Sequence, residues 1–444
     1  MCTNRYPPIT WPSWASIETG LRPSQHGIID FHTLDGQLVT AYDLEVPRIF
    51  EVAAMMGRRV LVVNPVPSTP IIPVKNLNVL SLEMFSHKLV YHGEFVKRYA
   101  RLFPREAPAP EKCDVEDYAA IANGYLELLE KAENFDYVWI ATNYPDRLLH
   151  VCPDAVERFV EGEKLFLEAI DAIVEEGLSK FDVVMVVSDH GFTLYKRVIH
   201  VNVALHKAGL ARFTSDPTRA PPHTPELHKR TVLCVNPRLV YLLERLRLRG
   251  VARRAARLVS RMTRSKVVMR SMFLDWVNSE ALQPCHMYGV VVRKAELIDH
   301  VIRILSEIEG VRLVEPREFY DPGPFNERYP HVIVLPDHDK GYTISHYYSS
   351  DIITERLTPD HHPDGVFSVY PMDALQDAGF NINMKLRVVN PVIIGGVQFA
   401  LLGLPLQRGT PRRAIERILG VKLSEADYTV KWRIAKRFAS RTIH

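Results

Sequence analysis

The stretch KFDVVMVVSDHGF, from Lys180 to Phe192, indicates the class of fold. A nearly continuous run of apolar residues here follows a helical pattern that extends from about 154 to 178. Similar apolar runs are found in RRVLVVNPV at 58–66, after the helical pattern of 46–56, and in FDYVWIATN at 135–143. Apolar strands that alternate with helices are typical of parallel strands covered on both faces. We therefore predict an α/β sandwich with a central, mostly parallel sheet and helices on both faces.

The chain changes character after residue 212. A proline-rich connection at 214–225 is followed by 241–270, which contains ten Arg and Lys residues and one acidic residue. Apolar residues recur at helical spacing between 239 and 262, which predicts two short basic amphipathic helices. HVIVLP at 331–336 then returns to strand character. We expect a core formed by 1–212 and 326–444, with a cap or insertion at 213–325.

The basic surface of this insertion has three interpretations. It is a solvated face, a cap that attracts phosphate-rich substrates, or a surface that touches anionic lipid. The net charge of the chain is only +3, so we expect no specific binding of nucleic acid. The sequence does not indicate an oligomeric state.

The remaining composition bears on the compartment. Five cysteines are scattered over 444 residues without a C-x-x-C pair, which fits a reducing compartment and predicts a cytoplasmic protein. The longest apolar run, at 388–406, is interrupted by Asn390, Pro391 and Gln398. This pattern favours a buried strand followed by a core helix over a transmembrane segment.

Three pairs of polar residues stand at or after predicted strand ends. They are Asp146 with His150, Asp189 with His190, and His361 with His362, the last pair in a predicted loop. Ligands of open α/β sheets bind at the carboxyl ends of the strands. Imidazole nitrogens and carboxylate oxygens are ligands of zinc, and two such ions can clamp a phosphoryl group. The sequence therefore predicts a site for two divalent ions.

The N-terminal stretch PPITWPSWASIETG, at 7–20, offers a nucleophile for the same site. Thr10 lies between Pro8 and Pro12, at a predicted strand-to-helix junction. A threonine hydroxyl becomes a useful nucleophile when metal coordination lowers its pKa. The helix that follows would direct its N-terminal N–H groups at an anionic phosphate.

These motifs resemble the type I phosphodiesterase/nucleotide pyrophosphatase family of the alkaline phosphatase superfamily. The resemblance rests on four segments in the order of the family: PPITWPSWASIETGLRPSQHGI, YPDRLLH, VVSDHGF and HHPDGVF. It implies an alkaline-phosphatase-like sandwich. It also implies that the protein hydrolyses small-molecule substrates, either phosphodiesters or nucleotide pyrophosphates. The reaction would pass through a phosphothreonine intermediate.

The resemblance also implies roles for individual residues. Thr10 matches the nucleophile. Asp146, His150 and His361 match the ligands of one metal ion, and Asp189 and His190 match ligands of a second ion that the nucleophile also contacts. Zinc is the expected metal, and manganese is the alternative. His362 competes with His361 for one role, and the family pattern favours His361.

Two departures from the family affect these expectations. The family begins with a strand that ends in Asp-Gly and supplies a further ligand of the second ion, whereas nothing precedes Met1 here. We expect the chain to begin inside a domain, without that strand, that Asp and the first helix. The second departure is Phe31, at the position where nucleotide pyrophosphatases related to autotaxin have a phosphate-binding Asn.

The departures leave alternatives beside the leading hypothesis of a metal-dependent phosphodiesterase. One alternative is another chemistry on the same fold: a phosphomonoesterase, a sulfatase or a phosphonate hydrolase. A different class is an inactive, truncated fragment or a binding module. The residues of the substrate pocket are not identifiable from the sequence.

Overall fold

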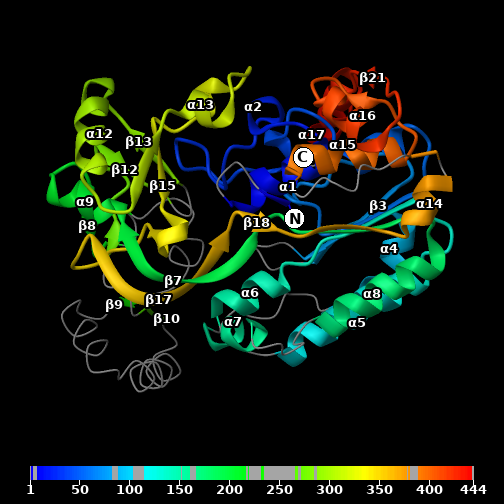
Figure 1. Cartoon of the computed structure of the whole chain (residues 1–444), viewed down its shortest axis with the longest axis horizontal. Coiled ribbons are helices and arrows are strands. Elements are labelled where there is room, and N and C mark those ends of the chain that lie inside the picture. Colours follow the sequence, from blue (N-terminus) through cyan, green and yellow to red (C-terminus); the bar gives the residue numbers. More distant parts are fainter. Residues whose placement is uncertain are drawn as a thin grey trace.

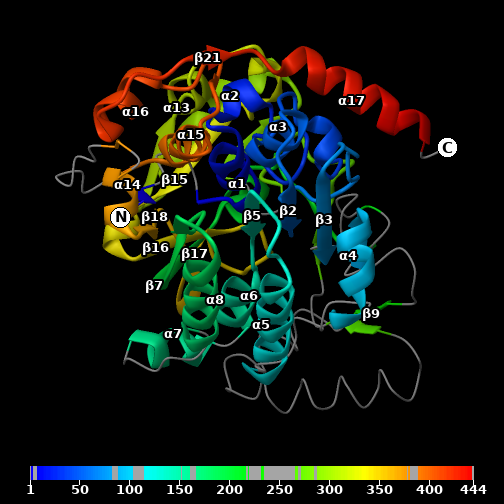
Figure 2. The ribbon, with the colours of Figure 1, turned by 90° about the vertical axis from the view of Figure 1, so that its right-hand side faces the viewer.

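A four-stranded sheet lies at the centre of the larger part of the molecule (Figure 2). The computed structural model describes residues 2–3, 8–82, 89–103, 115–151, 153–160, 167–216, 219, 232–234, 266–268, 272–284, 288–377, 379–380 and 389–442. Within them, β2 (Val60–Val63) pairs in parallel with β3 (Leu77–Leu82) and with β5 (Tyr137–Ile140). β4 (Leu89–His92) adds an antiparallel edge next to β3. The predicted strands at 58–66 and 135–143 are thereby confirmed.

Three helices cover one face of this sheet. They are α1 (Thr10–Thr19), α3 (Ile49–Met55) and α15 (Pro391–Leu401). Val60 and Val62 of β2 point into the apolar core that these helices form with the sheet. Gly57 follows α3 with a positive φ of 91°, as a helix-ending glycine should.

The opposite face is covered by α5 (Val115–Glu130) and α8 (Leu167–Lys180), seen in Figure 1 below the sheet. Leu61 and Val63 point into this second core, because successive side chains of a strand face opposite sides. The predicted α/β sandwich is therefore confirmed. The helix predicted over 154–178 is represented by α7 (Pro153–Val160) and α8, and residues 161–166 between them lie outside the described residues.

A long antiparallel ribbon connects the sandwich with the rest of the molecule (Figure 1). Its strands are β7 (Gly191–His200) and β17 (Ile353–His362). Phe192 pairs with His361 and Gly191 with His362 at one end of the ribbon. The expectation that the two histidines lie in a loop is therefore wrong: they are the last residues of β17. Just before β7, β6 (Val184–Val187) forms as predicted and pairs with the antiparallel β19 (Phe367–Tyr370).

The other end of the ribbon meets a second sheet and a third core. This sheet has the order β12 (Ala281–Leu282), β13 (Gly289–Val292), β15 (Val332–Pro336) and β14 (Val311–Val314). α9 (Val201–Lys207) and α12 (Ile298–Ser306) pack on it. The strand predicted at 331–336 is thus β15, and it lies beside strands of the segment 213–325. The division into a core and an insertion stays a prediction, and the basic helices predicted at 239–262 lie outside the described residues.

The described C-terminal part of the chain is mainly helical. The run at 388–406 forms α15, whose first turn is capped by the Asn390 side chain accepting from the N–H of Ile393 at 3.0 Å. The strand predicted before it falls mostly outside the described residues. α16 (Arg412–Leu419) and α17 (Thr429–Thr442) follow. Within the described part of the chain, no helix combines the length and the apolar character that crossing a bilayer requires.

Short elements complete the described chain. They are β1 (Cys2–Thr3), α2 (Pro23–His26), α4 (Glu94–Tyr99), α6 (Tyr144–Val151), β8 (Phe213–Thr214), β9 (Val232–Cys234), β10 (Lys266–Val268), β11 (Phe273–Leu274), α13 (Pro316–Tyr320), β16 (Tyr342–Ser345), β18 (Asp364–Gly365), α14 (Met372–Asp377), β20 (Leu406–Gln407) and β21 (Glu425–Ala426).

Candidate active site

Thr10 is the first residue of α1, at the predicted junction. Ile9 precedes it in an extended conformation, and Pro12 lies in the first turn of the helix. Proline is tolerated there because the backbone N–H groups of the first turn make no hydrogen bond within the helix. The side chain of Thr10 is buried. Its Oγ1 lies 3.4 Å from Nε2 of His190. The start of α1 therefore brings the hydroxyl to one of the predicted histidine ligands.

Asp146, His150 and His361 form the first cluster. Asp146 and His150 are one turn apart on α6, so both point to the same side of that helix. Oδ1 of Asp146 is 3.0 Å from Nε2 of His361 and 3.4 Å from Nε2 of His150. The two Nε2 atoms are 2.9 Å apart. All three ligand atoms lie within 4.8 Å of one another, a spacing that one metal ion could bridge.

Asp189 and His190 form the second cluster, in the connection between β6 and β7. Oδ2 of Asp189 is 3.2 Å from Nε2 of His190. The same nitrogen faces Thr10 Oγ1, so a carboxylate, an imidazole and a hydroxyl converge there. The imidazole rings of His190 and His361 stack with centroids 3.7 Å apart and an interplanar angle of 18°. The two clusters are therefore immediate neighbours.

Backbone carbonyls orient both stacked histidines. Nδ1 of His190 donates to the carbonyl of Gly191 at 3.0 Å, and Nδ1 of His361 donates to the carbonyl of Pro8 at 2.6 Å. When Nδ1 carries the proton, the lone pair of Nε2 remains available for a metal ion. Pro8 lies two residues before Thr10, so this second bond also ties the nucleophile's segment to β17.

The pKa values of the two carboxyl groups diverge. Burial alone would raise the pKa of Asp146, but His150 and His361 hold it well below its usual value. Burial and the charge of Asp146 raise the pKa of Asp189 to about 7. Such crowding of carboxylates is relieved when a cation lies among them.

The histidines respond to the same surroundings. Burial and the neighbouring His361 lower the pKa of His190 to about 3. Burial would also lower the pKa of His361, but the hydrogen bond and charge of Asp146 raise it to about 9. The ligand atoms of Asp146, His150 and His361 face one another at hydrogen-bond distances. This donor set therefore fits a divalent cation. The cation would replace the protons that these three side chains share in their hydrogen bonds.

Three side chains fix the backbone of His361. Its N–H donates to Oδ1 of Asp360 at 2.8 Å, and Thr343 Oγ1 donates to the other oxygen of that carboxylate at 2.5 Å. Its carbonyl accepts from the hydroxyl of Tyr195 at 2.9 Å. His361 is therefore held at its N–H, its carbonyl and its ring, whereas His362 points to the other face of β17.

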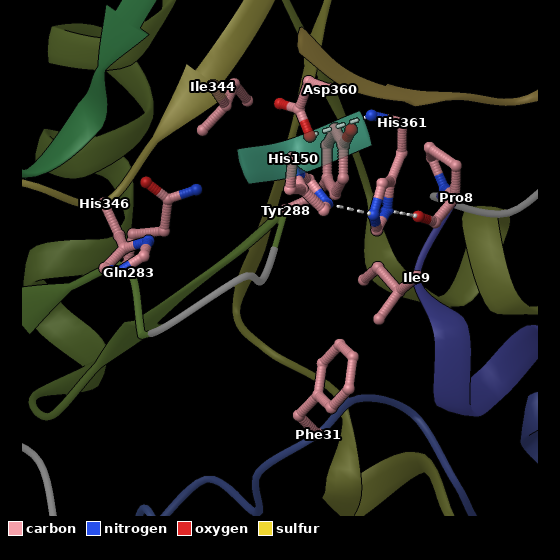
Figure 3. Close-up of a pocket in the computed structure, with 10 residues that line it drawn as sticks. All are labelled: Pro8, Ile9, Phe31, His150, Gln283, Tyr288, Ile344, His346, Asp360 and His361. Carbon is pink, nitrogen blue, oxygen red and sulfur yellow. Dashed lines mark hydrogen bonds between the residues drawn. The ribbon is translucent and has the colours of Figure 1, made fainter. Parts of the chain in front are cut away.

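A pocket opens beside the first cluster (Figure 3). The residues that line it are Pro8, Ile9, Phe31, His150, Gln283, Tyr288, Ile344, His346, Asp360 and His361. Phe31 faces the cavity across from His150 and His361 in Figure 3, and its ring also contacts Trp11, with centroids 5.1 Å apart. Phe31 thus presents an aromatic ring to the pocket.

The far wall of the pocket is organised by one buried residue. The amide of Asn202 donates to the carbonyls of Gln283 and His346, at 2.8 and 3.1 Å. Its oxygen accepts from the N–H of Gln283 at 2.7 Å. Residues from the third core thereby meet those of the sandwich at the site.

The structure brings together all six residues that the sequence predicted: Thr10, Asp146, His150, Asp189, His190 and His361. Sequence reasoning did not find Gln283, Tyr288, Ile344 or His346. They belong to no motif, and only the packing of β12, β13 and β16 near β17 brings them to the pocket.

The fold is of α/β architecture, and its site places clustered carboxylate and imidazole groups beside a threonine at a helix start. The family model of type I phosphodiesterase/nucleotide pyrophosphatase matches residues 1–362. The chain belongs to this family. No curated protein matches the sequence at a significant level.

Solved structures share the fold. Phosphonoacetate hydrolase from Sinorhizobium meliloti, in complex with phosphonoformate, has a TM-score of 0.53 and 15% identity, over 90% of this chain and 86% of that chain. Human ectonucleotide pyrophosphatase/phosphodiesterase 5 also has a TM-score of 0.53, with 14% identity over 94% of this chain and 90% of that chain. The chain is thus a hydrolase of the phosphodiesterase/nucleotide pyrophosphatase type, with an alkaline-phosphatase-like fold.

Proposed function

We propose that the chain hydrolyses phosphodiesters or nucleotide pyrophosphates through a phosphothreonine intermediate on Thr10. One observation carries the proposal. Thr10 Oγ1 and Asp189 Oδ2 lie 3.4 and 3.2 Å from the same nitrogen of His190, beside the cluster of Asp146, His150 and His361. The hydroxyl is therefore next to both groups of potential ligands, as a metal-activated nucleophile requires.

We propose two divalent ions as cofactors. Asp146, His150 and His361 would hold one ion, and Asp189 and His190, with Thr10, the other. The mixture of imidazole nitrogen and carboxylate oxygen favours zinc, with manganese as the alternative. Bound divalent ions would lower the pKa of the Thr10 hydroxyl and neutralise charge on the phosphoryl group.

The chain's own residues then carry out two displacements. Oγ1 of Thr10 attacks phosphorus, and the bond from phosphorus to the alcohol or nucleotide oxygen breaks, with the electron pair going to that oxygen. The N-terminus of α1 stabilises the negative charge of the phosphoryl oxygens. Water then attacks the phosphothreonine, which releases a phosphomonoester and restores the hydroxyl.

A phosphonate hydrolase is the second candidate, and Phe31 is the observation that favours it. An aromatic ring lines the pocket where nucleotide pyrophosphatases related to autotaxin have an Asn. A small phosphonate needs fewer polar contacts outside the metal site than a nucleotide does. A phosphomonoesterase or a sulfatase would use the same nucleophile.

The cytoplasm remains the proposed compartment, and this proposal rests on the scattered cysteines alone.

Replacement of Thr10 tests the nucleophile. We expect Thr10→Ala to lower kcat for bis-p-nitrophenyl phosphate by about 10³-fold or more, because no hydroxyl remains to form the covalent intermediate. Thr10→Ser should retain activity and, in acid-quenched samples, carry a p-nitrophenyl phosphoryl group on the replacement hydroxyl, which mass spectrometry detects. Full activity of Thr10→Ala with its metal bound would refute the proposal.

Substrate comparison tests the class of reaction. The rates with bis-p-nitrophenyl phosphate, p-nitrophenyl phosphate, p-nitrophenyl sulfate and phosphonoacetate should be measured on zinc-loaded protein. We expect the diester to be preferred. A preference for the monoester, the sulfate or the phosphonate would assign the chain to the corresponding alternative.

A further inference from the structure

The outer face of the C-terminal helix α17 carries an exposed row of large apolar side chains. Val430, Ile434 and Phe438 are four residues apart, so they form one stripe along the helix. Their exposed fractions are 64%, 51% and 66%. Single exposed apolar residues are normal on a protein surface, but three aligned bulky side chains form a continuous ridge.

The inner face of the same helix is firmly attached to the body of the protein. Trp432 is fully buried, and its indole N–H donates to the carbonyl of Leu44 at 3.1 Å. The ammonium of Lys436 donates to the carbonyls of Tyr42 and Leu44, at 2.5 and 3.0 Å. The apolar ridge therefore faces outward because the opposite face of α17 is already used.

Positive charge flanks the ridge. Lys431, Arg433 and Arg437 are exposed, and on a helical projection Lys431 lies on one side of the stripe and the two arginines lie on the other. No acidic residue follows Asp427 in the chain. An apolar stripe between basic borders is the pattern of helices that lie in the plane of an anionic membrane surface.

The shape of this surface also favours a lipid layer over a protein partner. α17 runs along the outside of the molecule and ends away from the central sheet (Figure 2). A protein partner would need a groove that matches this single-helix stripe. A bilayer interface accepts a ridge of any outline, and α17 is too short to cross it.

We propose that the outer face of α17 docks the enzyme on membranes that contain anionic lipids, with Val430, Ile434 and Phe438 in the interface and the basic side chains at the headgroups. This binding is peripheral and does not depend on the proposed catalytic function, because no residue of the active site takes part.

Co-sedimentation of the full chain with vesicles tests the proposal. Vesicles of phosphatidylcholine with phosphatidylserine should pellet the protein at low salt, and vesicles of phosphatidylcholine alone should pellet much less. We expect the double variant Ile434→Ser/Phe438→Ser to bind the anionic vesicles about ten-fold more weakly or worse, because it removes two of the three inserting side chains. Lys431→Gln/Arg433→Gln should weaken binding and reduce its dependence on salt.

Val277→Ser is the matched control, since Val277 is 66% exposed, like Phe438, but lies far from α17 in the sequence. This variant should bind vesicles like the unmodified chain, and all variants should retain hydrolysis of a soluble diester. The proposal would be overturned if anionic vesicles did not pellet the unmodified chain, or if they pelleted the Ile434→Ser/Phe438→Ser variant equally well. The proposal would also be overturned if the unmodified chain were a dimer in size-exclusion chromatography and the double variant were a monomer, since a second copy would then cover the ridge.

Discussion

Two adjacent histidines have different surroundings because they belong to a strand. In β17, His361 points to Asp146 and His150, whereas His362 points to the opposite face, where its ring lies near that of His338 with a centroid distance of 6.2 Å. Nδ1 of His362 accepts from the N–H of Asp364 at 3.1 Å. The alternation of the strand therefore allows only one of the two to reach the first cluster.

This difference predicts the outcome of a matched pair of substitutions. His361→Ala should lower the affinity of the first site for zinc by at least about ten-fold and abolish diester hydrolysis, because one of three ligands is lost. His362→Ala should retain both properties. Metal content by plasma mass spectrometry and the rate of diester hydrolysis are the measurements. Loss of zinc in His362→Ala alone would contradict the assignment.

At the scale of elements, α1 is positioned by very close packing against α15. A Cβ added at Gly395 would lie 2.5 Å from the Cα of Gly20 and 2.7 Å from the carbonyl oxygen of Ile17. The side-chain amide of Gln398 on α15 also donates to that carbonyl, at 3.0 Å. Because Thr10 is the first residue of α1, the packing of α1 against α15 helps to fix the position of the proposed nucleophile in the active site.

Gly395→Ala should therefore disturb both stability and catalysis. We expect a loss of about 1–3 kcal/mol in the free energy of unfolding, since the added methyl group meets backbone that can move only as a whole helix. The rate of diester hydrolysis should fall as well. Gly177→Ala on α8 is the control, because its Cβ would meet only the side chain of Val184. Urea denaturation and steady-state kinetics give both readouts, and an unchanged Gly395→Ala would disprove this role of the contact.

The elements differ in how well the sequence predicts them. β2, β5 and β6 were predictable because their apolar runs are bounded by helical patterns. β17 was not, because ITERLTPDHH contains Pro359 and does not alternate, so the strand depends on its pairing with β7. For the same reason, motif residues at 146, 189 and 361 could be predicted to meet, whereas Gln283 and His346 could not. Their place in the pocket depends on Asn202 and on packing between distant segments.

At the scale of the whole molecule, a buried charge cluster couples folding to pH. Glu18, Arg48 and Glu51 lie in the interior between α1 and α3. Arg48 binds Glu51 at 2.6 Å, while Glu18 is 3.8 Å from Arg48 and accepts from the N–H of Val66 at 3.2 Å. One guanidinium thus serves two carboxylates. Burial raises the pKa of Glu18 from 4.5 to about 8, although Arg48 opposes the rise.

The raised pKa predicts that stability falls with rising pH. The folded chain keeps the proton of Glu18 up to about pH 8, whereas the unfolded chain releases it near 4.5. The contribution of Glu18 is therefore fully present below pH 4.5 and is lost as the pH rises to about 8. Glu18→Gln, a neutral isostere, should remove this dependence. Its free energy of unfolding relative to the unmodified chain should increase between pH 5 and pH 8, on the order of a few kcal/mol.

Urea denaturation of both chains across that range is the measurement, because other titrating groups cancel in the difference. Glu355→Gln serves as the control, since the side chain of Glu355 is 84% exposed and its substitution should leave the pH profile unchanged. Parallel stability curves for Glu18→Gln and the unmodified chain would show that Glu18 is ionised in the folded state. Arg48 would then face two ionised carboxylates, and the interior around α1 would tolerate a net negative charge at neutral pH.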